Sequence, residues 1–65
     1  MTGMDPDEVW RLLRNWAIDR AAAEGYTLPP NPWRHMVGRT LPTGEYEIEV
    51  RDARDRPLVI YRFKP

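Results

Sequence analysis

Several residue types that enzymes depend on are absent or rare in this chain of 65 residues. It contains no cysteine, no serine and no glutamine, and His35 is its single histidine. Without cysteine there is no disulfide and no thiolate metal site, and without serine or cysteine the common nucleophiles are missing. The chain has no glycine-rich phosphate loop, and its acidic residues lack the spacing of a calcium loop. We therefore predict a protein that is not an enzyme and that holds no metal or cofactor.

The chain also lacks net charge and any long apolar run. Ten basic residues, nearly all of them arginine, balance ten acidic residues. No apolar run approaches the roughly 20 residues that a membrane span needs. The first five residues, Met-Thr-Gly-Met-Asp, lack the basic-then-apolar order of a signal peptide. We therefore expect a cytoplasmic protein that does not interact with membranes.

The length predicts a single small domain, residues 1–65, with little stability of its own. A domain of about 60 residues buries only about 60% of the surface that its unfolded chain exposes. The composition, 42% hydrophobic and 11% aromatic, argues against intrinsic disorder. Because no disulfide is possible, we expect part of the stability to come from association with a partner.

The N-terminal part predicts an amphipathic helix over residues 6–24. Asp5 is suited to the N-cap, Pro6 to the first helical position and Gly25 to the residue after the helix. With 100° per residue, one face of this helix is predicted to meet the core, and Ile18 falls on the opposite, polar face. The predicted core face consists of Val9, Leu12, Leu13, Trp16, Arg20 and Ala23, with Ala17 beside them and Trp10 and Ala21 at the margin.

The middle segment, residues 26–43, is rich in proline, which excludes a long helix. Trp33 and Met36 are apolar side chains able to fill a gap in the core. Residues 34–37 are predicted as a short edge strand. We expect the segment to cross the surface and to pack against the rest of the domain.

The C-terminal part predicts a β-hairpin over residues 45–63. Apolar and polar residues alternate strictly over 45–51, and residues 58–63 form a second β-branched and aromatic run. In the connecting turn Asp52 takes the first position, and Asp55 takes the left-handed position that usually requires glycine. The predicted fold class is therefore α+β, a helix packed on an antiparallel hairpin or a small three-stranded sheet.

A regular hairpin with this turn predicts which residues share a face of the sheet. Val50 would then lie opposite Leu58, Ile48 opposite Ile60 and Tyr46 opposite Arg62, all facing the helix. The other face would carry Glu45, Glu47, Glu49, Val59, Tyr61 and Phe63.

Two interpretations of that second face stay open. The proline-rich segment around Trp33 can fold over its aromatic residues, because a two-stranded hairpin needs more cover than one helix gives. Alternatively, the aromatic residues stay exposed and bind a protein, either a different one or a second copy of the chain. The predicted partner-binding residues are Val59, Tyr61, Phe63, Glu47, Glu49 and Ile18.

Nucleic-acid binding is the alternative function. Arginines gather at the hairpin tip, where a β-ribbon could contact phosphates. Asp52 and Asp55 within the cluster reduce its attraction for a polyanion, so this function ranks second. The residues concerned are Arg51, Arg54, Arg56 and Arg62.

Overall fold

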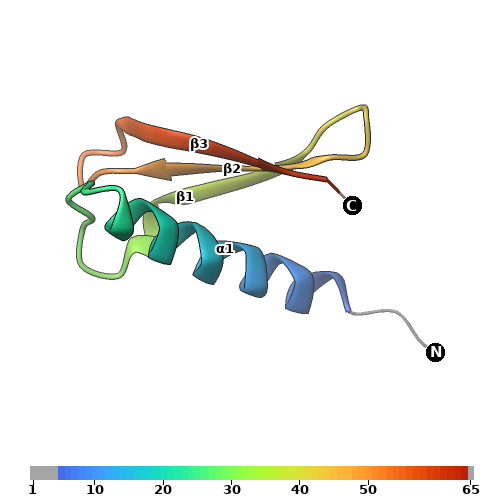
Figure 1. Cartoon of the computed structure of the whole chain (residues 1–65), viewed down its shortest axis with the longest axis horizontal. Helices are drawn as coiled ribbons and strands as arrows, with labels where there is room; N and C mark the ends of the chain where they lie inside the picture. The colour runs from blue at the N-terminus through green and yellow to red at the C-terminus, as the bar shows by residue number, and fades with distance from the viewer. Residues whose placement is uncertain (1–4, 65) are drawn as a thin grey trace.

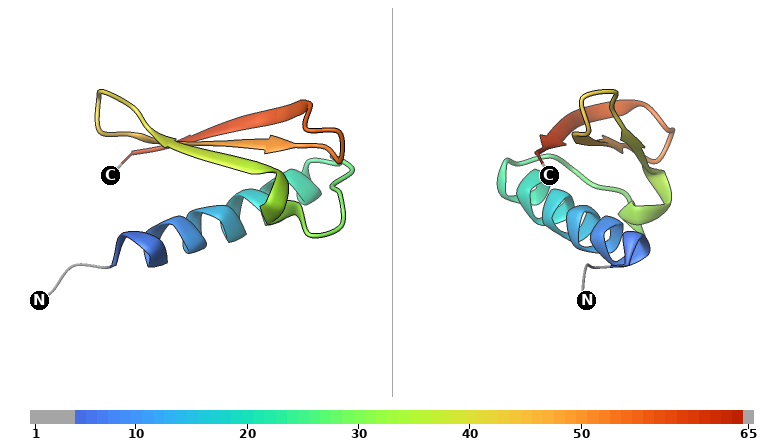
Figure 2. Two further views of the ribbon diagram at one scale, coloured as in Figure 1. Left: turned by 180° about the vertical axis from the view of Figure 1, so that it is seen from behind. Right: turned by 90° about the vertical axis from the view of Figure 1, so that its right-hand side faces the viewer.

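The computed structural model describes residues 5–64 as one helix followed by a three-stranded antiparallel sheet (Figure 1). The α+β prediction is confirmed. In chain order the elements are α1 (Pro6–Ala23), the 3-10 helix η1 (Pro32–His35), β1 (Met36–Thr40), β2 (Tyr46–Arg51) and β3 (Pro57–Phe63). Both α1 and η1 lie on one side of the sheet (Figure 2), which we call its inner face. Within residues 5–64 no helix is both long enough and apolar enough to cross a membrane.

The two ends of α1 follow from the predicted capping residues. The carboxylate of Asp5 accepts a hydrogen bond of 3.1 Å from the backbone N–H of Asp7. At the other end Gly25 adopts φ +92°, and its N–H and that of Tyr26 donate to carbonyl groups of the last turn. This arrangement is a Schellman motif, which stops the helix where the sequence predicts.

The predicted edge strand at residues 34–37 is displaced toward the C-terminus. Arg34 and His35 belong to η1, and the strand begins at Met36. Pro32 occupies the first turn of η1, and Asn31 before it has φ +54°. These two residues turn the chain into a short helix, because proline fixes φ and suits a helical start. The strand then pairs with β2 along its whole length.

The turn between β2 and β3 has the predicted structure. Asp55 has φ +59°, the left-handed conformation that aspartate tolerates. The carboxylate of Asp52 accepts hydrogen bonds from the backbone N–H groups of Arg54 at 2.8 Å and Arg56 at 2.9 Å. His35 of η1 also reaches this turn, with its Nδ1 3.0 Å from the carboxylate of Asp55. The turn is therefore closed by its own side chains and connected to η1.

The predicted pairing of β2 with β3 is wrong by one residue. A bulge at Val50 and Arg51 shifts the register, so that Val50 lies opposite Val59 and Ile48 opposite Tyr61. Because side chains alternate between faces, a shift of one residue exchanges the faces of all residues beyond it. Consequently Val59, Tyr61 and Phe63 pack against the core beside α1, whereas Ile60 and Arg62 point to the outer face.

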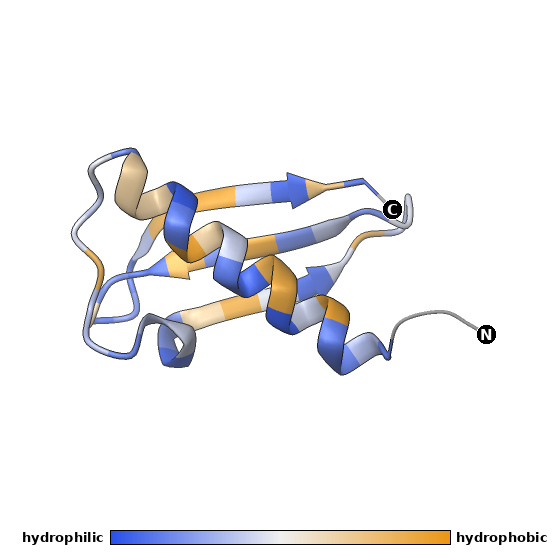
Figure 3. Cartoon of the chain, turned by 60° about the horizontal axis from the view of Figure 1, so that its bottom comes forward, coloured by the Kyte–Doolittle hydropathy of each residue, from blue (hydrophilic) through white to orange (hydrophobic). Residues whose placement is uncertain are grey.

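The helix face that meets the sheet is also different from the predicted one. Ala17 and Ala21 are buried, with Trp10 and Leu13 partly buried, whereas Leu12 and Trp16 are exposed. Trp16 therefore does not lie at the centre of the core, and the true face is rotated by about 90° on the helix. The helix crosses the sheet diagonally (Figure 3), and its two buried side chains are the small Ala17 and Ala21.

The core that results is thin. Within residues 5–64 the fully buried apolar residues are two alanines of α1 and two residues of β2, Ile48 and Val50. Met36 packs against this cluster, as predicted for a side chain of the middle segment. Trp33 does not, because it remains exposed on η1. Trp33 therefore does not cover the aromatic residues of β3; Trp16 of α1 packs on Tyr61 and Phe63, and Leu28 of the middle segment packs against the core.

Close packing of Trp10 against the backbone of β1 predicts a strong effect of substitutions at Gly38. A Cβ placed on Gly38 would lie 2.6 Å from Cζ3 of Trp10, whose ring also packs edge-to-face on Tyr46. Gly38→Ala should cost about 1–3 kcal/mol of unfolding free energy in urea denaturation. In a Trp10→Leu background the cost should vanish, because alanine suits a strand better than glycine does. Equal effects in both backgrounds would contradict this contact.

Candidate functional site

The structure separates the predicted partner-binding residues into different environments. Glu47 and Glu49 lie on the outer face of the sheet, whereas the three residues predicted beside them, Val59, Tyr61 and Phe63, lie on the inner face. Ile18 is half-buried on α1. The expected surface of acidic and aromatic side chains is therefore not formed.

An ion-pair network covers the outer face. Glu47 accepts hydrogen bonds from Arg39 of β1 at 2.8 Å and from Arg62 of β3 at 3.3 Å, so a carboxylate of the central strand is bound from both neighbours. Glu49 pairs with Arg51 on its own strand, and Arg39 lies 3.8 Å from it. Both glutamates are only 7% exposed beneath these guanidinium groups. The network supplies hydrogen-bond donors to the two buried carboxylates, and its guanidinium groups cover the outer face of the sheet around them.

The electrostatics of this network favour the charged form of Glu47. The hydrogen bond from Arg39 lowers the pKa of Glu47 from its ordinary 4.5, burial opposes this effect, and Arg62 adds to the lowering. Asp52 also has a lowered pKa, because it accepts backbone hydrogen bonds, first from Arg56. Both carboxylates are therefore ionised at neutral pH and serve the fold rather than proton transfer.

Tyr61 connects β3 to the C-terminal end of α1. Its hydroxyl donates a hydrogen bond to the carboxylate of Glu24, which also accepts one of 2.9 Å from Arg20. Burial, followed by this hydrogen bond, raises the pKa of Tyr61 to about 12. Trp16 packs edge-to-face on the rings of Tyr61 and Phe63, and Arg20 lies over its indole. Tyr61 is thus a structural residue.

Three large apolar side chains are exposed on β3 and on the face of α1 that contacts it. Ile60 of β3 is 49% exposed on the outer face; on α1, Trp16, which packs on Tyr61 and Phe63, is 44% exposed, and Leu12, one turn before it, is 52% exposed. Because β3 ends the strand order β1-β2-β3, its outer edge has no neighbouring strand within residues 5–64. We call Leu12, Trp16 and Ile60 together with this edge the β3-edge surface. The helical periodicity placed Leu12 and Trp16 on one face of the helix, but this face was predicted to be buried. Ile60 was likewise predicted to face the helix.

Most of the arginines in the proposed nucleic-acid site are bound to carboxylates. Arg51 pairs with Glu49, Arg62 with Glu47, and Arg56 with Asp52 at 3.1 Å. Arg54 has no ion pair with any residue in 5–64. The four side chains therefore present less free positive charge than their number suggests.

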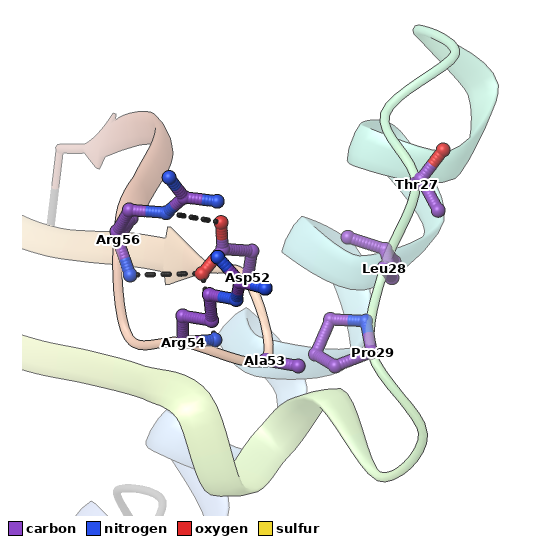
Figure 4. Close-up of a pocket in the computed structure, with 7 residues that line it drawn as sticks. All are labelled: Thr27, Leu28, Pro29, Asp52, Ala53, Arg54 and Arg56. Atoms are coloured by element: carbon purple, nitrogen blue, oxygen red, sulfur yellow. Dashed lines mark hydrogen bonds and ion pairs between the residues drawn. The ribbon is translucent and has the colours of Figure 1, made fainter.

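A pocket of about 420 Å³ lies between this turn and the segment after α1 (Figure 4). Asp52, Ala53, Arg54 and Arg56 line one side and Thr27, Leu28 and Pro29 the other. The carboxylate of Asp52 accepts hydrogen bonds from the backbone N–H groups of Arg54 and Arg56 and one from the side-chain Nε of Arg56. Within residues 5–64 no group of three or more His, Asp and Glu side chains is arranged to hold a metal ion.

Comparisons with known proteins return no match for this chain. No family model matches it, and neither a curated protein nor a solved structure is similar enough to count as a match. Its function is therefore argued from its own residues.

Acid should destabilise the domain through the outer-face network. Because the folded-state pKa of Glu47 is lower than its ordinary 4.5, its contribution is present above that pH and is lost as the pH falls through the lowered value. Urea midpoints at pH 7 and pH 3 should therefore differ less in Glu47→Gln than in the wild type. Asp19→Asn, at an exposed helix position, is the matched control and should behave like the wild type. Equal acid sensitivity of all three proteins would contradict the role of Glu47.

Proposed function

We propose that this chain is a small, non-enzymatic protein-interaction module whose β3-edge surface binds a second copy of the same chain. The observation that carries the proposal is the contrast between the thin core and this surface. In residues 5–64 the large side chains that are fully buried are Ile48 and Val50, whereas Leu12, Trp16 and Ile60 are each about half exposed. A domain of this size gains stability by covering such side chains.

The edge of β3 is better suited to receive a strand than the edge of β1. β1 has five residues, and those of them that are exposed, Gly38, Arg39 and Thr40, include no large apolar side chain. Short length is a feature that protects an edge from further pairing. β3 has seven residues, with Ile60 exposed on its outer face and Trp16 of α1 exposed beside its inner face. An added strand would pair with its backbone and cover these side chains together.

A second copy fits this edge by symmetry and by charge. Two β3 strands related by a two-fold axis pair antiparallel, and each copy supplies the same apolar residues. If the axis passes near Tyr61, Ile60 of one copy lies opposite Arg62 of the other, so the two Arg62 side chains do not face each other. The chain has no net charge, so association meets no overall electrostatic repulsion.

Nucleic-acid binding at the hairpin tip is less well supported, since three of its four arginines pair with carboxylates. A cytoplasmic location remains part of the proposal on the sequence argument alone.

The oligomeric state tests the proposed function. Light scattering over a wide concentration range should give a molar mass that approaches twice that of the chain, with a melting temperature that rises with concentration. Ile60→Lys should weaken the dimer at least about tenfold, because it places a charge in the interface. Thr40→Lys, at an exposed position of the other edge strand, should leave it unchanged.

Two results would overturn the proposal. If the wild-type chain stays monomeric at every concentration, the β3-edge surface does not bind a second copy. A dimer that Thr40→Lys disrupts and Ile60→Lys does not would place the interface on β1 instead.

A further inference from the structure

A second site lies between α1 and η1. Arg11, Arg14 and Asn15 of α1, with Trp33 of η1, line a pocket of about 270 Å³. On a helix with about 100° per residue, Arg11 and Arg14 lie about 140° and 160° from Trp16, whereas Asn15 lies about 100° from it and borders Leu12. The residues that line the pocket are therefore different from those of the β3-edge surface, and the two arginines face away from Trp16.

The backbone at Trp33 is held in a short helix, and its indole is open to solvent. Pro32 fixes the start of η1, and the N–H of Arg34 donates to the carbonyl of Asn31 at 3.0 Å. The indole is 55% exposed, the largest value among the exposed large apolar side chains of residues 5–64. Trp10 and Trp16 both pack edge-to-face on other rings, whereas Trp33 has no such contact within these residues. The exposed indole offers a face on which a planar ring can stack.

The two arginines that line the pocket with this indole have at most a weak carboxylate partner within residues 5–64. Arg20, Arg39, Arg51, Arg56 and Arg62 form ion pairs elsewhere in the molecule. In contrast, Arg14 in the pocket wall and Arg34 next to Trp33 pair with no residue in 5–64. Arg11 contacts Glu8 only at 3.6 Å, with both side chains well exposed, so this pair contributes little. Guanidinium groups match phosphate oxygens with paired hydrogen bonds.

From these observations we propose that the pocket binds a nucleoside phosphate. The base stacks on Trp33, the phosphate binds Arg11 and Arg14, and the amide of Asn15 donates to or accepts from the edge of the base. The volume is slightly below the range of about 300–1,000 Å³ that is usual for small-molecule sites. It therefore suits one nucleotide rather than a larger cofactor. The nucleotide is either free or part of a single-stranded nucleic acid, since both carry the same groups.

Binding is measured by tryptophan fluorescence and by anisotropy of a labelled probe. The probes are adenosine 5′-monophosphate, adenosine, inorganic phosphate and a single-stranded oligoadenylate of eight nucleotides. We expect the monophosphate to bind more tightly than adenosine or phosphate, because both groups contribute. An oligonucleotide that binds far more tightly than the monophosphate identifies single-stranded nucleic acid as the source, and similar affinities identify the free nucleotide.

Variants assign the binding to this pocket. Arg14→Gln and Trp33→Ala should each weaken binding about tenfold or more. Lys64→Gln is the matched control, because Lys64 is also a cation without an ion pair within residues 5–64 but follows the end of β3. It should leave the affinity unchanged. Both Arg14 and Lys64 are exposed, so neither substitution is expected to affect folding.

Three results would overturn the proposal. One is the absence of binding by every probe at millimolar concentration. Another is an equal loss of affinity in Lys64→Gln and Arg14→Gln, which would indicate nonspecific attraction to positive charge. The third is tight binding of an acidic aromatic peptide, such as Asp-Phe-Asp, with no measurable binding of the monophosphate. Because none of these results involves the β3 edge, they leave the proposed dimer untouched.

Discussion

The bulge at Val50 and Arg51 is the constraint on which the rest of the structure depends. By inserting one residue into β3, it places Val59, Tyr61 and Phe63 beside α1 and turns Ile60 and Arg62 outward. Without this shift the aromatic side chains would lie over the glutamates of β2, and the hydroxyl of Tyr61 would not reach Glu24. The aromatic part of the core, the contact of Arg62 with Glu47 and the exposure of Ile60 all follow from the same extra residue.

Local signals in the sequence predicted where the helix, the strands and the turn lie in the chain. They could not predict which face of α1 and which face of β3 are buried. Asp5, Gly25, Asp52 and Asp55 act through hydrogen bonds within a few residues, so their roles were predictable. The bulge has no glycine or other marker, and its register depends on how much apolar surface meets the helix. The orientation of α1 was missed because periodicity favoured Trp16, whereas the closest approach to the sheet requires the small Ala17 and Ala21.

The same rotation decides which surfaces are available for binding. Large side chains were displaced to the flanks of α1, so that Leu12 and Trp16 lie near β3 and the opposite flank carries Arg14 beside the indole of Trp33. The outer face is occupied by ion pairs between arginine and glutamate. We therefore propose an apolar surface for protein association at one flank and a cationic, aromatic pocket at the other. Both proposals rest on residues that the sequence had not assigned to these roles.

Proton NMR tests the register of β3, on which this account depends most directly. The account predicts nuclear Overhauser effects between the indole of Trp16 and the rings of Tyr61 and Phe63, and a cross-strand pair between Ile48 and Tyr61. If Ile48 is instead paired with Ile60, and Trp16 contacts Ile60 rather than the two rings, the bulge is absent. The faces of β3 would then be exchanged, and the proposed dimer surface would not exist.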